Sequence, residues 1–271
     1  MADTHPGRVL LVLDLNGLLL DRIRLAKGTP MGVGPRDALE GGCAVYFRPH
    51  ARDFVSWCFA NFSVAVWTTA KLKNVRSLIR EISFPHTERL VFTWGQGECT
   101  RTRCSQNGKP VFLKRLDRVW AAYDFGPHNT VLVDDAIYKS ACNPSFTSVH
   151  PREWNVLRAD GTGGIGDEAL APHGRLRSLL AGLAQTPDVR LALSTALPSY
   201  PELIPDEQQR HAAFALVPGL VACVARMAEA NPAMDGARSL QAEPMPTRDR
   251  RCEAAPGQSP GKSGERRRKK D

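Results

Sequence analysis

Carboxylates follow two apolar runs of the sequence and are the first candidates for chemistry. Asp14 comes directly after the run at residues 9–13, and Asp134-Asp135 come directly after the run at residues 130–133. A continuous apolar run is typical of a strand covered on both faces of a parallel sheet. Because ligands bind outside the carboxyl ends of such strands, we expect these carboxylates to meet at one edge of the sheet.

Two threonines and a lysine occupy further places where chemistry is possible. Thr68 and Thr69 follow a third apolar run at residues 62–67, and Lys114 lies further along the chain. Taken singly, each residue has an ordinary structural interpretation. Asp14 is typical of a cap or turn, the threonines are typical strand formers, and Lys114 is typical of a solvated surface charge.

The order of these residues along the chain resembles the haloacid-dehalogenase (HAD) superfamily of phosphotransferases. The closer resemblance is to the FCP/SCP-type CTD-phosphatase homology domain, and it covers about residues 8–185. The motifs that carry it are Leu13-Asp14-Leu15-Asn16-Gly17-Leu18, Phe47-Arg48-Pro49-His50 with Phe54, Val66-Trp67-Thr68-Thr69-Ala70, Gly108-Lys109-Pro110, Phe112-Leu113-Lys114, and Val131-Leu132-Val133-Asp134-Asp135 with Asn143-Pro144.

The resemblance implies a nucleophile and a magnesium site. Asp14 would attack phosphorus and form an aspartyl-phosphate, which splits hydrolysis into two easier steps. Asp14, Asp134 and the backbone carbonyl of Asn16 would bind Mg²⁺ through oxygen ligands. Asp135 would support the water bound to the metal, so it completes the metal set that we expect.

The resemblance also implies a phosphate site. Thr68 would hold a phosphate oxygen through its hydroxyl and neighbouring N–H groups, including those around Thr69. Lys114 would neutralise the charge on nucleophile and phosphate, and it is therefore expected to take part in catalysis. The implied substrate is phosphoserine or phosphothreonine in a phosphoprotein or phosphopeptide. The structural interpretation is preferred for Arg48-Pro49-His50, as the start of a helix.

The sequence departs from the family pattern at position 16. Active members have Asp two residues after the nucleophile, as general acid and then base, whereas this chain has Asn16. An amide has no proton to give, and general acid–base catalysis contributes roughly 10²–10⁴-fold. We therefore expect slowed hydrolysis with retained Mg²⁺ and phosphate binding. Ala136-Ile137 in place of Ser-Pro and Arg115 in place of Asp are smaller departures.

A non-catalytic binding module is the alternative function. One relative of this domain is a receptor subunit of the mitochondrial inner-membrane import translocase, with degraded phosphatase motifs, and Asn16 fits such a pseudophosphatase. Residues 1–6 lack the features of a secretory signal or a presequence. The longest apolar stretch, residues 212–224, is shorter than the ~20 residues of a membrane span. We expect no membrane span and a location in nucleus or cytoplasm, with the mitochondrion as alternative.

The positive charge of the chain is concentrated at one end. The formal charge is +8, and residues 248–271 carry nine basic and four acidic residues, which leaves +3 for residues 1–247. A body at +3 does not have the charge of a nucleic-acid-binding domain, so we expect no specific nucleic-acid partner. The cluster at residues 266–270 is typical either of a nuclear address or of a solubilising tail.

The seven cysteines form no CxxC pair, which favours reduced, intracellular thiols over a disulfide framework. A zinc site at Cys99 and Cys104 is disfavoured because no second pair accompanies them. The oligomeric state is left open.

The alternation of apolar runs and helical patterns predicts an α/β fold. With the resemblance, we expect a HAD-like Rossmannoid three-layer sandwich with a mainly parallel sheet and no large cap domain. The expected organisation is a homology domain at residues 5–195, an accessory helical segment at 196–230 and a disordered basic tail at 231–271. The expected strands are 9–13, 62–67, 90–94, 130–133 and 148–149. The expected helices are 52–61, 72–79, 169–184 and one or two within 206–230, with a short helix or turn at 114–120. Residues 95–110 are expected to be irregular and residues 161–166 to form a flexible loop.

Overall fold

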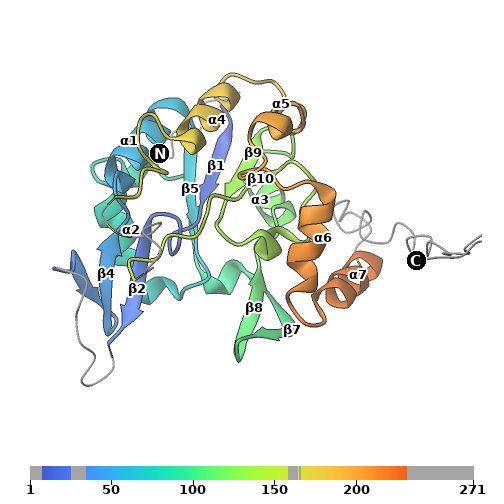
Figure 1. Cartoon of the computed structure of the whole chain (residues 1–271), viewed down its shortest axis with the longest axis horizontal. Helices are drawn as coiled ribbons and strands as arrows, with labels where there is room; N and C mark the ends of the chain where they lie inside the picture. Colours follow the sequence, from blue (N-terminus) through green and yellow to red (C-terminus); the bar gives the residue numbers. More distant parts are fainter. Residues whose placement is uncertain (1–7, 26–34, 158–163, 165, 231–271) are drawn as a thin grey trace, which may run out of the picture. The chain divides into compact units, whose positions relative to one another are not determined.

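Five parallel strands form the central sheet, in the order β10-β9-β1-β5-β6. The computed structural model describes residues 8–25, 35–157, 164 and 166–230. The strands are β1 (Leu10–Leu13), β5 (Ser63–Trp67), β6 (Thr93–Trp94), β9 (Thr130–Val133) and β10 (Ser148–Val149). Figure 1 labels β1, β5, β9 and β10. The mainly parallel sheet predicted from the continuous apolar runs is confirmed.

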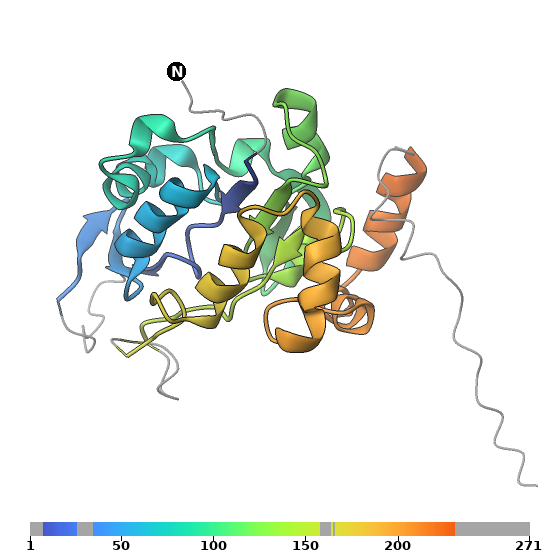
Figure 2. The same cartoon turned by 90° about the horizontal axis from the view of Figure 1, so that it is seen from above.

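Alternate residues of the strands pack against two different layers, as expected for side chains that point to opposite faces. Leu11 and Leu13 of β1 lie in the larger apolar cluster, whose helical members come from α1 (Ala51–Asn61), α2 (Arg76–Ser83), α4 (Arg175–Leu183) and α5 (Val189–Ala196). Leu10 and Val12 lie in a second cluster with α3 (Asp117–Ala122). The sheet is therefore the middle of three layers, and Figure 2 shows α1, α4 and α5 on one side of it.

Two antiparallel elements flank the carboxyl edge of this sheet. One is a three-stranded sheet of β2 (Leu20–Arg24), β4 (Cys43–Phe47) and β3 (Ala38–Glu40). The other is a hairpin of β7 (Thr100–Gln106) and β8 (Lys109–Leu113). Both lie in the lower part of Figure 1.

The hairpin shows that the expected irregular stretch at residues 95–110 is wrong. Asn107 and Gly108 both have positive φ, 51° and 72°, which is the conformation of a two-residue hairpin turn. An Asn-Gly pair is the strongest short-range signal for such a turn, so the hairpin could have been predicted from the sequence.

Helix boundaries differ from the expected ones at two glycines. The helix expected from residue 169 begins at Arg175, after Gly174, where a Cβ would lie 2.8 Å from the carbonyl oxygens of Glu168 and Ala169. Residues 206–230 form two helices, α6 (Glu207–Ala215) and α7 (Leu220–Ala230). Gly219 separates them with a φ of 75°.

Three other expectations differ only in extent. Of the strand expected at 90–94, Thr93–Trp94 form β6, while the Val91 N–H donates to the Val64 carbonyl alongside β5. The helical pattern at 72–79 divides into a 3₁₀ turn at Leu72–Asn74 and α2. The helix expected at 114–120 begins later, at Asp117.

No single helix in the described part of the chain is long and apolar enough to cross a membrane. The bent pair α6 and α7 meets the length and composition criteria together, with 110° between the two helices. The six described cysteines are free thiols. The basic tail at 231–271, with its cluster at 266–270, lies outside the described residues, as does most of the loop at 161–166.

Candidate active site

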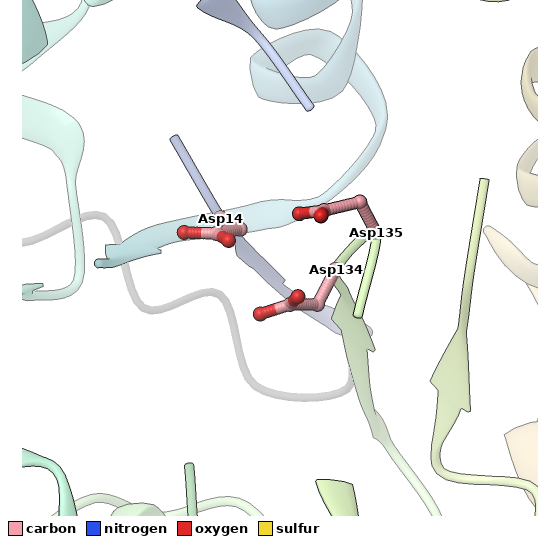
Figure 3. Close-up of side chains that lie close together, drawn as sticks. All are labelled: Asp14, Asp134 and Asp135. Carbon is pink, nitrogen blue, oxygen red and sulfur yellow. The ribbon is translucent and has the colours of Figure 1, made fainter. Parts of the chain in front are cut away.

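The register of β1 and β9 brings two carboxylates together at the carboxyl edge of the sheet. Leu13 pairs with Val133, and the Asp14 N–H donates to the Val133 carbonyl at 2.9 Å. Asp14 and Asp134 therefore leave neighbouring strands at the same level, and Asp135 follows at once. Carboxylate oxygens of the three residues lie within 4.8 Å of one another, and Figure 3 shows them gathered at the strand ends.

Two buried ammonium groups lie between these carboxylates. The Lys114 Nζ is 2.9 Å from Asp14 Oδ1 and 2.5 Å from Asp134 Oδ2. The Lys139 Nζ is 2.6 Å from Asp14 Oδ2, 2.9 Å from Asp134 Oδ1 and 3.6 Å from Asp135 Oδ1. Both lysines are buried, so these are strong charge-assisted contacts in a region that is poor in water.

Asn143 holds the backbone that carries Lys114. Its side-chain amide donates to the Lys114 carbonyl at 2.9 Å, and its Oδ1 accepts from the Leu116 N–H at 2.9 Å. The Lys114 N–H donates to the Lys139 carbonyl at 2.8 Å, which ties the two lysines together through the main chain. The buried Asn143 thus has a structural role, which is to hold the main chain on both sides of Arg115.

The charges of the cluster change the acidity of its members. Burial raises the pKa of the Asp134 carboxyl, but attraction from Lys114 and Lys139 outweighs burial and the net shift is well below the ordinary value. Burial raises the pKa of Asp135 to about 7, against the attraction of Lys139. Burial lowers the pKa of Lys139, but the three carboxylates outweigh this effect and raise it well above the ordinary value.

The donor set fits a hard divalent cation. When all three carboxylates are ionised they face two ammonium groups, which leaves one negative charge uncompensated within the cluster. The buried Oδ1 of Asp135 has no hydrogen-bond partner. Oxygen-only ligands of this kind suit Mg²⁺. Asp14, Asp134 and Asp135 are the residues that would hold it; the backbone carbonyl of Asn16 stays a prediction.

Gly17 allows the close approach of Asp135. Its φ is +87°, and a Cβ there would lie 2.8 Å from the Asp135 Cγ. Only glycine adopts this conformation without strain and leaves room for the carboxylate. The Arg48 guanidinium fixes the same turn, donating to the Leu18 carbonyl at 3.2 Å and to the Asp167 carboxylate at 2.8 Å. Arg48 therefore positions the loop after the predicted nucleophile. The interpretation of Arg48-Pro49-His50 as a helix start agrees with α1, which begins at Ala51.

A cavity of about 610 Å³ opens beside the carboxylates. Asp14, Asn16 and Thr69 line it from the sheet, and Asp135 and Lys139 line it from the segment after β9. The exposed side chain of Asn16 therefore faces the same space as the carboxylate of Asp14. An open, polar cavity of this kind can admit a phosphate group and part of the molecule that carries it.

Thr68 lies next to the cavity and not among its lining residues. It is buried, and its Oγ1 accepts from the Ala70 N–H at 3.2 Å. β5 pairs with β1 so that Val66 is opposite Leu13, which places Thr68 just beyond the level of Asp14. The predicted phosphate-binding role stays a prediction for Thr68, Thr69 and Lys114.

Sequence reasoning missed two groups of residues at this site. Lys139 lies on a 3₁₀ turn, Ile137–Ser140, four residues after Asp135, and this spacing returns its side chain to the carboxylates. Residues of the hairpin also line the cavity, namely Gln106, Asn107, Lys109, Pro110 and Val111. The Asn-Gly turn could have indicated the hairpin, but nothing local indicated that it faces Asp14.

A buried histidine supports the carboxyl end of β9 and leads to a pH prediction. His150 Nδ1 is 2.8 Å from the Asp134 carbonyl oxygen, and Nε2 is 2.9 Å from Ser148 Oγ. Burial lowers its pKa from 6.5 to about 4, so the ring is neutral in the folded protein at pH 7. Between these two values the unfolded chain binds one more proton than the folded chain, and stability falls as the pH falls.

We expect this histidine to lower the free energy of unfolding by on the order of 3 kcal/mol as the pH falls from 7 to 4. Urea unfolding at a series of pH values measures it. His150→Gln should show a shallower pH dependence, by up to one proton in that window. The control His173→Gln, at a side chain 76% exposed, should keep the slope of the parent protein. Equal slopes for the parent and His150→Gln would contradict the prediction.

The comparisons with known proteins agree with the motifs. The model of the NLI interacting factor-like phosphatase family matches residues 9–190. An FCP1 homology domain-containing protein of Schizosaccharomyces pombe is 29% identical over 148 residues, which cover 51% of this chain and 58% of that protein. The chain thus spans little more than half the length of this relative.

Two solved structures are also similar. One is a variant of the fission yeast RNA polymerase II CTD phosphatase Fcp1 bound to beryllium fluoride, with 14% identity, a TM-score of 0.41 and coverage of 88% of this chain and 68% of that chain. The other is Fcp1, described as an essential RNA polymerase II CTD phosphatase, with 12% identity, a TM-score of 0.38 and coverage of 85% and 67%. The family match over most of the sequence confirms the resemblance inferred from the motifs. The chain belongs to the NLI interacting factor-like phosphatase family and contains an FCP1-like phosphatase domain.

Proposed function

We propose that this protein hydrolyses phosphoserine or phosphothreonine in a phosphoprotein, with Mg²⁺ as cofactor and Asp14 as nucleophile, at a rate limited by Asn16. The observation that carries the proposal is the convergence of Asp14, Lys114 and Asp134 from separate segments into one buried, charge-paired cluster beside a polar cavity. Asp14 itself lines that cavity, together with Asn16.

The first step transfers the phosphoryl group to the protein. A carboxylate oxygen of Asp14 forms a bond to phosphorus, and the bond between phosphorus and the serine or threonine oxygen breaks. Lys114 holds Asp14 in place and stabilises the negative charge that spreads over the phosphoryl oxygens. Bound Mg²⁺ supplies further neutralisation of the charge on the phosphate.

The leaving alkoxide needs a proton, and Asn16 faces the cavity where a general acid would stand. The amide can donate a hydrogen bond but cannot release a proton, so the proton must come from solvent. The second step, attack of water on the aspartyl-phosphate, likewise lacks a base at position 16. Both steps are slowed, and substrates with good leaving groups are affected least.

The alternative function is a pseudophosphatase that binds a phosphorylated partner without turnover. Asn16 is the specific observation that favours it, because binding needs no general acid. Both functions require the phosphate site, and they differ in whether phosphate is released. An import-receptor role is the more particular form of this alternative and has no further support among the described residues.

Beryllofluoride binding tests the phosphate site independently of turnover, since the anion adds to a carboxylate nucleophile as a phosphoryl mimic. We expect beryllofluoride with Mg²⁺ to raise the melting temperature of the full chain by at least about 3 °C. That shift corresponds to a ligand present well above its dissociation constant. With EDTA in place of Mg²⁺ the shift should vanish. A protein that binds no beryllofluoride in the presence of Mg²⁺ would refute the proposal.

A further inference from the structure

Lys139 contacts more of the carboxylate cluster than any other cation in the described part of the chain. Its ammonium group lies 2.6 to 3.6 Å from oxygens of Asp14, Asp134 and Asp135, the three residues that would hold Mg²⁺. Lys114, by comparison, contacts Asp14 and Asp134 only. The Lys139 ammonium therefore has all three of the proposed metal ligands as its neighbours.

The backbone of Lys139 is fixed, and its buried side chain lies beside the cavity. The Lys139 carbonyl accepts from the Lys114 N–H, and the Lys139 N–H donates to the Ala136 carbonyl at 3.0 Å. Its side chain also lines the cavity of about 610 Å³. The main chain thus holds the residue in place, and the cavity gives its four-carbon side chain room to withdraw.

The net charge of the cluster shows how Lys139 affects the binding of a divalent cation. With all three carboxylates ionised and Lys114 alone beside them, the cluster would carry a net charge of −2, which a divalent cation would balance. With Lys139 as well, the net charge is −1, so Mg²⁺ would bring the cluster to +1. Two like charges a few ångströms apart in a buried site repel strongly, so the ammonium and the metal ion disfavour each other's presence.

We infer that Lys139 is a tethered cation that occupies the metal position of this site and competes with Mg²⁺. Without metal, Lys139 holds the three carboxylates together. When Mg²⁺ binds, the ammonium withdraws toward the cavity, so metal affinity is lower than the ligand set alone would give. The inference rests on the proposed function, because it takes the carboxylates as a magnesium site.

Titration calorimetry of the full chain with MgCl₂, at fixed ionic strength, measures the competition without any turnover. We expect Lys139→Met and Lys139→Gln to lower the Mg²⁺ dissociation constant at least about 10-fold, since each removes a charge beside the ion. The matched control is Lys109→Met, which removes a positive charge from the exposed rim of the same cavity. Lys109→Met is expected to change the Mg²⁺ dissociation constant by less than about 3-fold.

Thermal melting separates competition from a merely structural role. In EDTA, Lys139→Met should melt at least about 5 °C below the parent protein, because buried carboxylates lose their partner. Saturating Mg²⁺ should restore most of this loss. A loss that Mg²⁺ does not restore would overturn the inference, since it would assign Lys139 to packing.

The remaining outcomes distinguish this inference from the proposed function. Mg²⁺ affinity that is unchanged in both Lys139 variants, in a parent protein that binds Mg²⁺ and hydrolyses an aryl phosphate, would overturn the inference alone. Equal tightening by Lys109→Met would also overturn it, since the effect would then be general electrostatics. Absence of Mg²⁺ binding in the parent and in all variants would overturn both.

Discussion

Asp14→Asn is expected to lower the rate of aryl phosphate hydrolysis at least about 10⁴-fold and to abolish covalent phosphate on the protein. An amide oxygen is a poor nucleophile, so no aspartyl-phosphate forms, whereas the shape of the side chain hardly changes. The measurement is phosphate release with Mg²⁺, together with the amount of acid-stable, hydroxylamine-labile phosphate on denatured protein. An aryl substrate is the right choice because its leaving group needs little protonation, so Asn16 slows the transfer step least with such a substrate.

The control for this substitution removes a negative charge from the same cavity at another place. Glu153 lines the cavity, and Glu153→Gln should change the rate less than about 3-fold. The melting temperature of Asp14→Asn must also be measured, because Asp14 accepts from both Lys114 and Lys139. A folded Asp14→Asn protein that keeps more than a tenth of the parent activity would contradict the assignment of the nucleophile.

The sequence was sufficient to predict the carboxylates of the site, because their positions are determined by the ends of two strands. Residues 9–13 and 130–133 are continuous apolar runs, each followed by carboxylates, and parallel pairing brings such ends to one edge. The separation of Asp14 from Asp134 by 120 positions did not matter, because the strand pattern fixes the edge at which both lie. The layered α/β fold followed from the same runs.

The parts that could not be predicted depend on contacts between distant segments. Whether Lys139 points at the carboxylates depends on how a short 3₁₀ turn packs after β9, and whether Arg48 pairs with Asp167 depends on a loop 119 residues away. Neither contact has a periodic signal in the sequence. The hairpin at Asn107 is different, because its turn had a local signal and only its position beside Asp14 required the structure.

Asn16 and Lys139 together give the site an unusual charge. The family pattern expected from the motifs has a carboxylate at position 16, and Asn16 removes one negative charge from it. Lys139 adds one positive charge among the remaining carboxylates. Both features favour binding of an anionic phosphate group over binding of a divalent cation, and Asn16 also removes the group that would speed its release.

Restoring the carboxylate should therefore act mainly on turnover. We expect Asn16→Asp to raise the rate of phosphoserine hydrolysis by roughly 10²–10⁴-fold, the range that general acid–base catalysis contributes. The reason is the leaving group: a serine alkoxide must be protonated as its bond to phosphorus breaks, and Asn16 faces the cavity in which this happens. The measurement is kcat/KM for a phosphoserine peptide with Mg²⁺, as a function of pH.

The effect of an added negative charge on the rate must be distinguished from the effect of proton transfer by Asp at position 16. Asn107→Asp adds the same charge to the same cavity from the tip of the hairpin, at a residue whose positive φ Asp tolerates well, and it should change the rate less than about 3-fold. The gain from Asn16→Asp should shrink to less than about 10-fold on an aryl phosphate in the transfer step, because an aryl oxide leaves without a proton. A gain below 10-fold on phosphoserine would show that position 16 does not serve as the general acid, and that another feature of the site limits the reaction.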